Sequence, residues 1–283
     1  MKEKLYIQVK DHLLSQKTFS IVKNTGKPYL VTRPKPEIKD INNYYESKDY
    51  QSHKLNPKSI FEKFYSLFRN VMLIRKERLI RVFFKKPAKV LDIGSGTGDF
   101  LIYLKKRGWS VTGCEPSKKA RAHTKQKIFY TDLEKKGIQK EFDLITLWHS
   151  IEHVYDLKKT VGKINAIIKQ KGYLIVACPN YKSWDANYYQ ENWAAWDVPR
   201  HLRHFNKESI KETLTQNGFQ EVTSKPLFLD SIYVSILSEK ILMSNVPFIK
   251  GLFFGMVSNI VGLATKNYSS HIYVFKKVNK ANF

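Results

Sequence analysis

The sequence predicts an α/β fold built on a doubly wound sheet of seven strands, the last of them antiparallel. Two observations carry this prediction. From residue 88 onward, apolar runs of strand length alternate with stretches of helical periodicity, and a glycine-rich turn joins the first strand to the first helix. Residues 270–277 contain an apolar run at 272–275 and supply the closing strand. A β-hairpin region at the N-terminus and an apolar helical insertion before the last strand are expected as additions.

The glycine turn is the stretch around which the rest is organised. Residues 88–93 are mostly apolar and predict a buried parallel strand. Gly94, Gly96 and Gly98 follow at every second position, and residues 100–107 have a helical pattern. Glycine lets the backbone bend sharply and lets a ligand approach closely, so the turn predicts a notch of nucleotide size. A plain strand-to-helix turn is the alternative at this point.

An acid at the end of the next strand favours a ligand site. Residues 109–114 predict a second strand, and Glu115 follows it, 21 residues after Gly94. A carboxylate at this spacing can accept hydrogen bonds from a ribose diol, as in Rossmann-like sheets. The third glycine comes one position earlier than in the dinucleotide fingerprint, which argues against NAD.

The run Leu91-Asp-Ile-Gly-Ser-Gly-Thr-Gly98 resembles the first motif of class I S-adenosylmethionine (SAM) methyltransferases. The resemblance covers roughly residues 88–225 and implies a Rossmann-like fold with SAM as cofactor. It places Asp132, which follows the third strand at 127–130, beside the adenine amino group. The alternative role for Asp132 is a loop acid or a helix cap. The cofactor-binding residues that it implies are Asp92, Gly94, Ser95, Gly96, Thr97, Gly98, Glu115, Pro116, Asp132, Leu133 and His149.

A second informative stretch follows the fourth strand, at 142–148. His149, Glu152 and His153 lie where the carboxyl end of a strand meets ligands, and they could orient a hydroxyl, take its proton or bind a metal. The His-x-x-Glu-His pattern matches an inverted zinc-protease motif, but a protease would carry it on a long helix. The stretch instead resembles the Leu-Glu-His-Val block of ubiquinone-type O-methyltransferases, where a Glu-x-x-Glu-His set has been linked to a divalent cation. His149 replaces the first glutamate, so we expect no metal; Glu152 and His153 remain weak candidate ligands, and a structural role for them is open.

Residues 182–205 are dense in aromatic side chains and end in Pro-Arg-His-Leu-Arg-His-Phe, which resembles a block of small-molecule methyltransferases. Aromatic rings beside histidine and arginine can stack a planar acceptor, although core packing explains some of them. The candidate catalytic bases are His149, His201 and His204. Pro179-Asn-Tyr181 differs from the Asn-Pro-Pro-Tyr motif of amino-group DNA and RNA methyltransferases in order and position.

Three segments are expected along the chain. Residues 1–55 comprise a β-hairpin region that resembles a zinc ribbon without its cysteines, followed by a linker. Residues 56–87 predict an amphipathic helix with a basic face, and residues 88–283 predict the methyltransferase domain. Its apolar insertion, residues 230–265, is interpreted as a lid or a monotopic membrane contact, with a buried helical pair or a dimer surface equally open.

The composition limits the cellular locations and the binding partners that we expect for this protein. The two cysteines fall at strand ends, which fits a reducing cytosol, and the N-terminal residues lack the apolar core of a signal peptide. No stretch is expected to be a convincing transmembrane helix. The net charge of +24 attracts anionic partners, but lysine far outnumbers arginine, so no sequence-specific nucleic acid is expected. We expect a cytoplasmic protein, with a peripheral contact to the anionic inner face of a membrane left open.

Together these features predict a SAM-dependent methyltransferase acting on a small-molecule, lipid-linked or glycan acceptor, at a hydroxyl oxygen. Two alternatives remain. A nucleic-acid methyltransferase or binder would explain the positive charge, and a non-catalytic scaffold with the SAM fold would act through its hairpin and its apolar insertion.

Overall fold

The computed structural model describes residues 2–41, 44, 60–122, 129–130, 133 and 142–278. Its main sheet has seven strands, confirming the predicted α/β architecture. Only β11 runs antiparallel to its neighbours, β10 and β8, and the other described pairs are parallel. In order across the sheet the strands are β10 (Phe219–Pro226), β11 (Ser270–Lys277), β8 (Ile168–Pro179), β7 (Phe142–Trp148), β4 (Lys89–Ile93), β5 (Ser110–Cys114) and β6 (Phe129–Tyr130).

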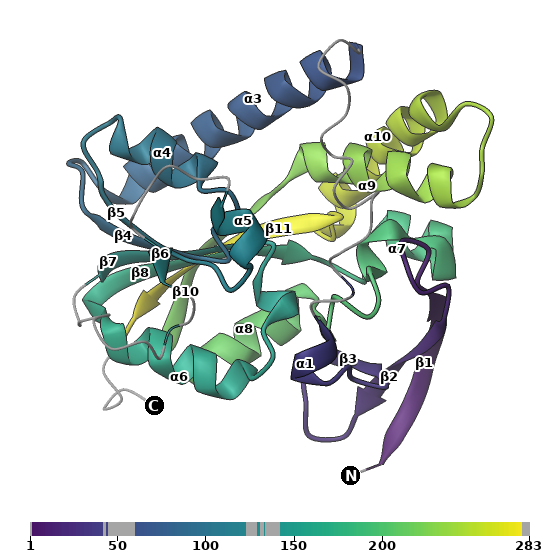
Figure 1. Ribbon diagram of the computed structural model, residues 1–283, viewed down its shortest axis with the longest axis horizontal. Helices are drawn as coiled ribbons and strands as arrows, with labels where there is room; N and C mark the ends of the chain where they lie inside the picture. The colour runs from purple at the N-terminus through teal and green to yellow at the C-terminus, as the bar shows by residue number, and fades with distance from the viewer. Residues whose placement is uncertain are drawn as a thin grey trace.

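Helices cover both faces of this sheet (Figure 1). Alternate residues of β4 point to opposite faces: Val90 packs in a cluster with Leu104, and Leu91 packs in another with Val161. Burial on both faces explains the nearly continuous apolar runs in the sequence. The covering helices are α3 (Ile60–Phe83) and α4 (Asp99–Lys105) on one face, and α6 (Leu157–Ile167) and α8 (Lys207–Thr215) on the other; α5 (Lys118–Ala122) follows β5.

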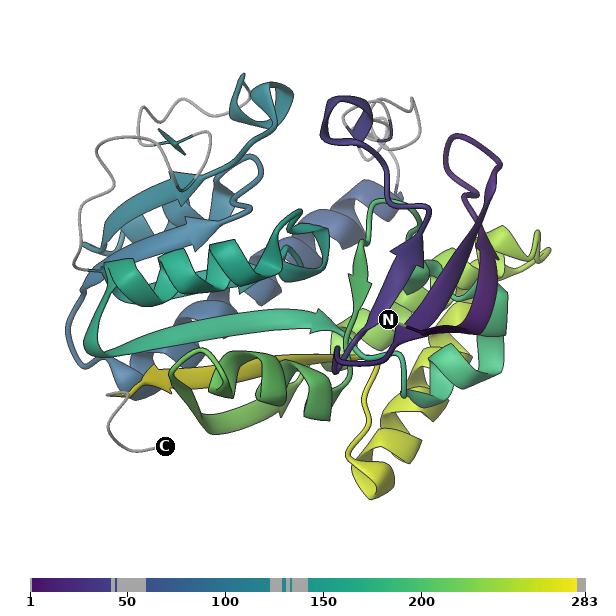
Figure 2. The ribbon, with the colours of Figure 1, turned by 90° about the horizontal axis from the view of Figure 1, so that it is seen from below.

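A second, four-stranded sheet lies beyond the carboxyl end of β8 (Figure 2). It is formed by β1 (Glu3–Lys10), β2 (Thr18–Asn24) and β3 (Leu30–Arg33), with the two-residue β9 (Arg203–His204) at its edge. The N-terminal hairpins therefore pair with a strand from the aromatic stretch. Short helical elements surround this junction: α1 (Ile38–Ile41), η2 (Ile151–His153), α7 (Trp184–Tyr189), η3 (Gln190–Asn192) and η4 (Ala194–Trp196).

The apolar insertion forms two helices, α9 (Phe228–Ile241) and α10 (Pro247–Thr265), packed as a hairpin. It begins earlier than predicted, because β10 ends at Pro226 and not at residue 229. By length and composition alone, α10 is apolar enough to cross a membrane, which differs from the sequence expectation that no stretch would be. Most of the helix is not buried inside the protein.

Candidate active site

The glycine turn after β4 has the geometry that a ligand cradle needs. Gly94, Gly96 and Gly98 all have positive φ, at 73°, 55° and 79°. The backbone N–H of Gly94 donates to the Cys114 carbonyl at 2.8 Å, which ties the turn to the end of β5. A Cβ on Gly94 would lie 2.4 Å from Ser150 Cβ, whereas a Cβ on Gly96 would meet nothing within 4 Å. Gly94 is thus required by packing, and Gly96 leaves space beside the turn.

Glu115 lies against this turn at the tip of β5, where the sequence spacing placed it. Its Oε2 accepts the Gly96 N–H at 2.9 Å and its Oε1 accepts the Ser117 N–H at 2.8 Å. Beside it, the buried Ser95 hydroxyl has no hydrogen-bond partner among the described residues. A carboxylate, an orphaned hydroxyl and open space at Gly96 together fit the ribose and methionine parts of SAM.

The other residues of the predicted cofactor set lie around this cradle. Asp92 is buried beneath it and accepts a hydrogen bond from Thr146 Oγ1 at 2.6 Å, and burial raises its pKa to about 6. Asp92 thus joins β4 to β7. Thr97 donates to Asp99 beside Gly98, Pro116 is exposed next to Glu115, and Leu133 is buried in the core. Asp132, the predicted adenine contact, lies outside the described residues.

His149 follows β7 and is held between two carboxylates. Its Nε2 lies 2.9 Å from Asp230 Oδ2 on α9, and its Nδ1 lies 3.7 Å from Glu152 Oε1. Burial favours the neutral ring, but the charge of Asp230, its hydrogen bond and then Glu152 outweigh burial and raise the pKa of His149 to about 10. An imidazole that is protonated at neutral pH cannot accept a proton, so the geometry does not support His149 as the general base. Nothing in the sequence marked Asp230 as its partner.

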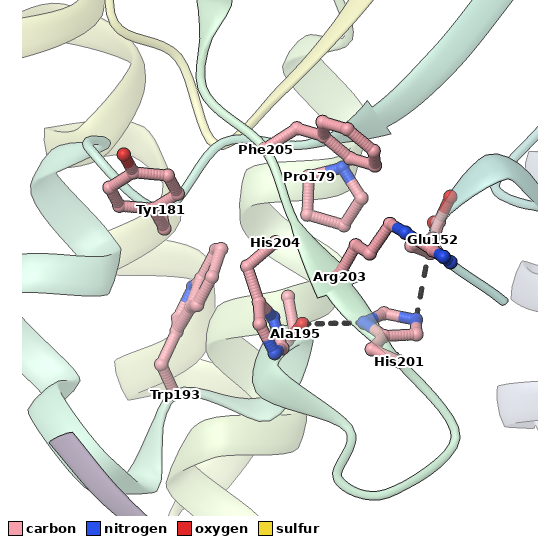
Figure 3. A pocket seen from close by; sticks show the side chains of 9 residues that line it. All are labelled: Glu152, Pro179, Tyr181, Trp193, Ala195, His201, Arg203, His204 and Phe205. Atoms are coloured by element: carbon pink, nitrogen blue, oxygen red, sulfur yellow. Dashed lines mark hydrogen bonds and ion pairs between the residues drawn. The ribbon is translucent and has the colours of Figure 1, made fainter. Parts of the chain in front are cut away.

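His201 lies in a pocket with aromatic walls (Figure 3). Its Nδ1 is 2.9 Å from the Ala195 carbonyl, which can only accept, so Nδ1 carries the hydrogen and Nε2 keeps its lone pair. Nε2 faces Glu152 Oε1 at 4.0 Å and Asp197 Oδ2 at 3.8 Å. Burial, reinforced by neighbouring His153, lowers the pKa of His201 to about 4 despite these carboxylates. The pocket is lined by Glu152, Pro179, Tyr181, Trp193, Ala195, His201, Arg203, His204 and Phe205.

His204 lines the same pocket and also has a structural task. The Thr32 hydroxyl donates to the His201 carbonyl at 2.6 Å, so it can only accept from His204 Nε2, at 2.9 Å. His204 therefore donates its Nε2 hydrogen to Thr32, and this hydrogen bond links β9 to β3. Burial lowers the pKa of His204 well below the usual value.

A buried ion-pair network holds the loop that carries His201, and sequence analysis did not anticipate it. Arg200 Nη2 lies 2.9 Å from Asp11 Oδ1 of the N-terminal hairpin, and Arg200 Nε lies 2.7 Å from Asp197 Oδ1. The Arg200 and Asp11 side chains are 1% and 0% exposed. The N-terminal hairpin thus positions the His201 loop through Arg200, although Asp11 lies far from that loop in the sequence.

Three side chains at the pocket could hold a divalent cation. The ligand atoms of Glu152, His153 and His201 lie within 4.8 Å of one another. The His153 Nδ1 is 3.1 Å from the Arg200 carbonyl, which orients the ring of this candidate ligand. Both Glu152 carboxylate oxygens are buried and accept no hydrogen bond from a described residue. One carboxylate and two imidazoles suit a transition-metal ion. The sequence had indicated Glu152 and His153 but not the contribution of His201.

Comparisons with known proteins identify the family of this chain. Residues 63–224, more than half of the chain, match the family described as a methyltransferase domain. A ubiquinone biosynthesis O-methyltransferase from Histophilus somni is 29% identical, over 34% of this chain and 48% of that protein. The chain spans about half the length of the curated relatives it matches.

Solved structures show the same fold. A magnesium protoporphyrin IX methyltransferase from Synechocystis, with bound SAH, superposes with a TM-score of 0.56 at 14% identity, covering 86% of this chain and 100% of that one. A SAM-dependent methyltransferase from Archaeoglobus fulgidus gives a TM-score of 0.51 at 21% identity, covering 77% and 100%. Because the family match covers more than half of the chain, the chain belongs to the family described as a methyltransferase domain.

Proposed function

We propose that this methyltransferase transfers the methyl group to a hydroxyl oxygen of a small-molecule, lipid-linked or glycan acceptor that enters the His201 pocket. The observation that carries the proposal is the unprotonated Nε2 of His201 in a pocket walled by Tyr181, Trp193 and Phe205. Aromatic walls favour a planar or ring-shaped acceptor. The name of the Histophilus somni relative, an O-methyltransferase, supports oxygen as the acceptor atom.

In this proposal His201 accepts the hydroxyl proton while the oxygen attacks the methyl group. The Ala195 carbonyl fixes the ring tautomer, and Glu152 and Asp197 stabilise the imidazolium as it forms. SAM, when bound, supplies the electrophilic methyl group, so the protein contributes binding, orientation and the proton acceptor.

One short segment connects the donor and acceptor sites. Ser150 packs under Gly94 and donates its hydroxyl hydrogen to the Ile93 carbonyl at 2.8 Å. Glu152, two residues later, lines the pocket. The residues after β7 therefore touch both the cradle for SAM and the pocket for its acceptor.

A divalent cation on Glu152, His153 and His201 would occupy the His201 Nε2, and it would act in place of that base by lowering the pKa of the acceptor hydroxyl. Turnover measured after treatment with a chelator and after readdition of Zn²⁺, Mn²⁺ or Mg²⁺ tests this role. Loss and recovery of activity indicate a metal, and unchanged activity leaves His201 as the proton acceptor alone.

The main test is His201→Ala, assayed by S-adenosylhomocysteine release with a panel of catechols, lipid-linked hydroxyls, glycans and RNA. We expect turnover to fall about 10²–10⁴-fold while the calorimetric affinity for SAM is unchanged. His12→Ala, in the turn between β1 and β2 and outside the pocket, is the matched control and should leave turnover intact. Unchanged turnover in His201→Ala, or methylation of RNA alone, would contradict the proposal.

A further inference from the structure

The helix α10 packs on α9 through its smallest side chains. A Cβ at Gly251 would lie 2.5 Å from Ile236 Cα, and one at Gly255 would lie 2.5 Å from Ile232 Cα. The helices are so close that no larger side chain could face inward at these positions. The buried residues of α10 are Gly251, Gly255, Ser258 and Gly262.

The large apolar side chains of α10 are consequently exposed. Ile249 is 70% exposed, Ile260 is 65% exposed and Phe253 is 56% exposed. A surface helix of a globular protein normally buries such a stripe, so this arrangement is inverted. Contiguous exposed apolar residues of this kind mark an interaction surface. We define the α10 surface as Ile249, Leu252, Phe253, Met256, Ile260 and Leu263.

The charges around this surface are of one sign. The sequence contains no aspartate or glutamate after Glu239, while Lys240, Lys250 and Lys266 flank or interrupt the apolar residues. These lysines suit anionic headgroups at the edge of a bilayer. A second copy is a poorer occupant, because a two-fold contact would bring the same lysines together.

The α10 surface is rigidly connected to the pocket. Asp185 on α7 accepts hydrogen bonds from Ser258 Oγ at 2.7 Å and from Trp193 Nε1 at 2.8 Å. Trp193 is a wall of the His201 pocket. On the same side, Phe254 contacts Tyr188 with ring centroids 4.5 Å apart. A partner bound to the α10 surface would therefore lie beside the His201 pocket.

We propose that the α10 surface docks this methyltransferase on an anionic lipid bilayer, with its apolar side chains in the acyl boundary and the flanking lysines at the headgroups. Because Asp185 and α9 hold α10 in place, the helix lies along the membrane and does not cross it. Figure 1 shows α9 and α10 together at one end of the molecule, beyond the end of β11. The proposal does not depend on the acceptor, since docking needs no turnover.

Sedimentation of the full chain with vesicles tests this surface. The vesicles are phosphatidylcholine alone and phosphatidylcholine mixed with phosphatidylglycerol, each at low and high salt. We expect the protein to sediment with the mixed vesicles and to be partly released by salt. Ile249→Ser and Phe253→Ser should each weaken this binding about tenfold or more. Val82→Ser, at a 74% exposed apolar position on α3, is the matched control and should bind like the wild type.

The charged arm uses Lys250→Gln with Lys266→Gln, compared with Lys158→Gln on the exposed side of α6. We expect the double variant Lys250→Gln with Lys266→Gln, and not Lys158→Gln, to reduce binding to the mixed vesicles. Circular dichroism and SAM affinity confirm that each variant is folded. Wild-type protein that stays in the supernatant with both vesicles would overturn the proposal. So would a stable dimer in the absence of lipid that Phe253→Ser dissociates, because a second copy would then cover the surface.

Discussion

The two halves of the proposed active site are built in different ways. The cofactor cradle comes from neighbouring strand ends and is held by backbone bonds at Gly94 and by Glu115. The acceptor pocket is assembled from distant segments, with Arg200 joining the His201 loop to Asp11 of the N-terminal hairpin. A local site depends on the backbone conformation of a few residues, whereas a distributed site depends on buried long-range contacts. Substitutions in the local half and in the distributed half should therefore have different effects on stability and on ligand binding.

The largest effect is expected from breaking the distributed half. Arg200→Met leaves Asp11 buried without its charge partner and should lower the free energy of unfolding by about 3–5 kcal/mol. Arg33→Met, which removes a surface pair with Glu3, should lower it far less, because solvent screens an exposed pair. Urea unfolding of both variants measures the difference. Equal losses would mean that Arg200 does not hold the pocket.

The next effect breaks the local half. Gly94→Ala combines a φ of +73° with a 2.4 Å clash against Ser150 and should cost about 2–5 kcal/mol of stability. Gly96→Ala has a φ of +55° and open space, so it should lose only about 1–2 kcal/mol of stability. Because that methyl group enters the space proposed for SAM, calorimetry should show weaker SAM binding in Gly96→Ala. Unchanged SAM affinity in this variant would argue against the proposed cradle.

A smaller effect concerns the pH dependence of stability beneath the cradle. The pKa of Asp92 is raised from 3.8 to about 6 by burial, so its contribution is most favourable below pH 3.8 and is lost as the pH rises to about 6. Asp92→Asn removes this penalty and should stabilise the protein by up to about 3 kcal/mol at pH 8. Thermal unfolding across pH should show the gain shrink toward pH 4.

Asp143 on β7 is the matched control for this measurement. Burial alone would raise its pKa, but Lys169 and the Lys89 N–H outweigh burial and lower it. Asp143→Asn should therefore destabilise the protein at neutral pH, with the loss diminishing in acid. A gain of stability in both variants would show that the removal of any acid stabilises this basic chain.

The smallest effect concerns the pair formed by His149, after β7, and Asp230 on α9. Asp230→Asn removes the strongest contribution that raises the pKa of His149, which should then fall from about 10 toward its usual 6.5. An NMR titration of the His149 ring measures this shift. The His149–Asp230 pair should contribute stability below pH 6.5 that is lost as the pH rises through 10. Glu208→Gln, in an exposed pair with Lys182, should leave the His149 titration unchanged.

The sequence predicted the local half well because its signals are themselves local. A strand, three glycines and Glu115 lie within one stretch of chain, and their spacing determines where the turn meets the carboxylate. The pocket was predicted only in part. His201 was marked by its motif, but its tautomer depends on Ala195, the charge of His149 depends on Asp230, and His204 is bound by Thr32. These partners are set by tertiary packing, which leaves no periodic pattern in the sequence.

The inversion of α10 was also beyond sequence analysis, for a related reason. The apolar residues of the insertion fit a lid, a buried pair or a membrane contact equally well. Which side of a helix is buried depends on what it packs against, and the glycines that face α9 became informative only once that contact was known.

The edge strand β9 has a consequence for how the protein is made. Thr32 and His201, whose contact secures β3 beside β9, are 169 residues apart. At about 5–20 residues per second, the ribosome needs roughly 10–30 seconds to supply the strand that completes the small sheet. During that time β1, β2 and β3 have emerged without the partner that covers their edge. These three strands are therefore synthesised well before the strand that completes their sheet, and a chaperone that binds nascent chains would meet them in that state.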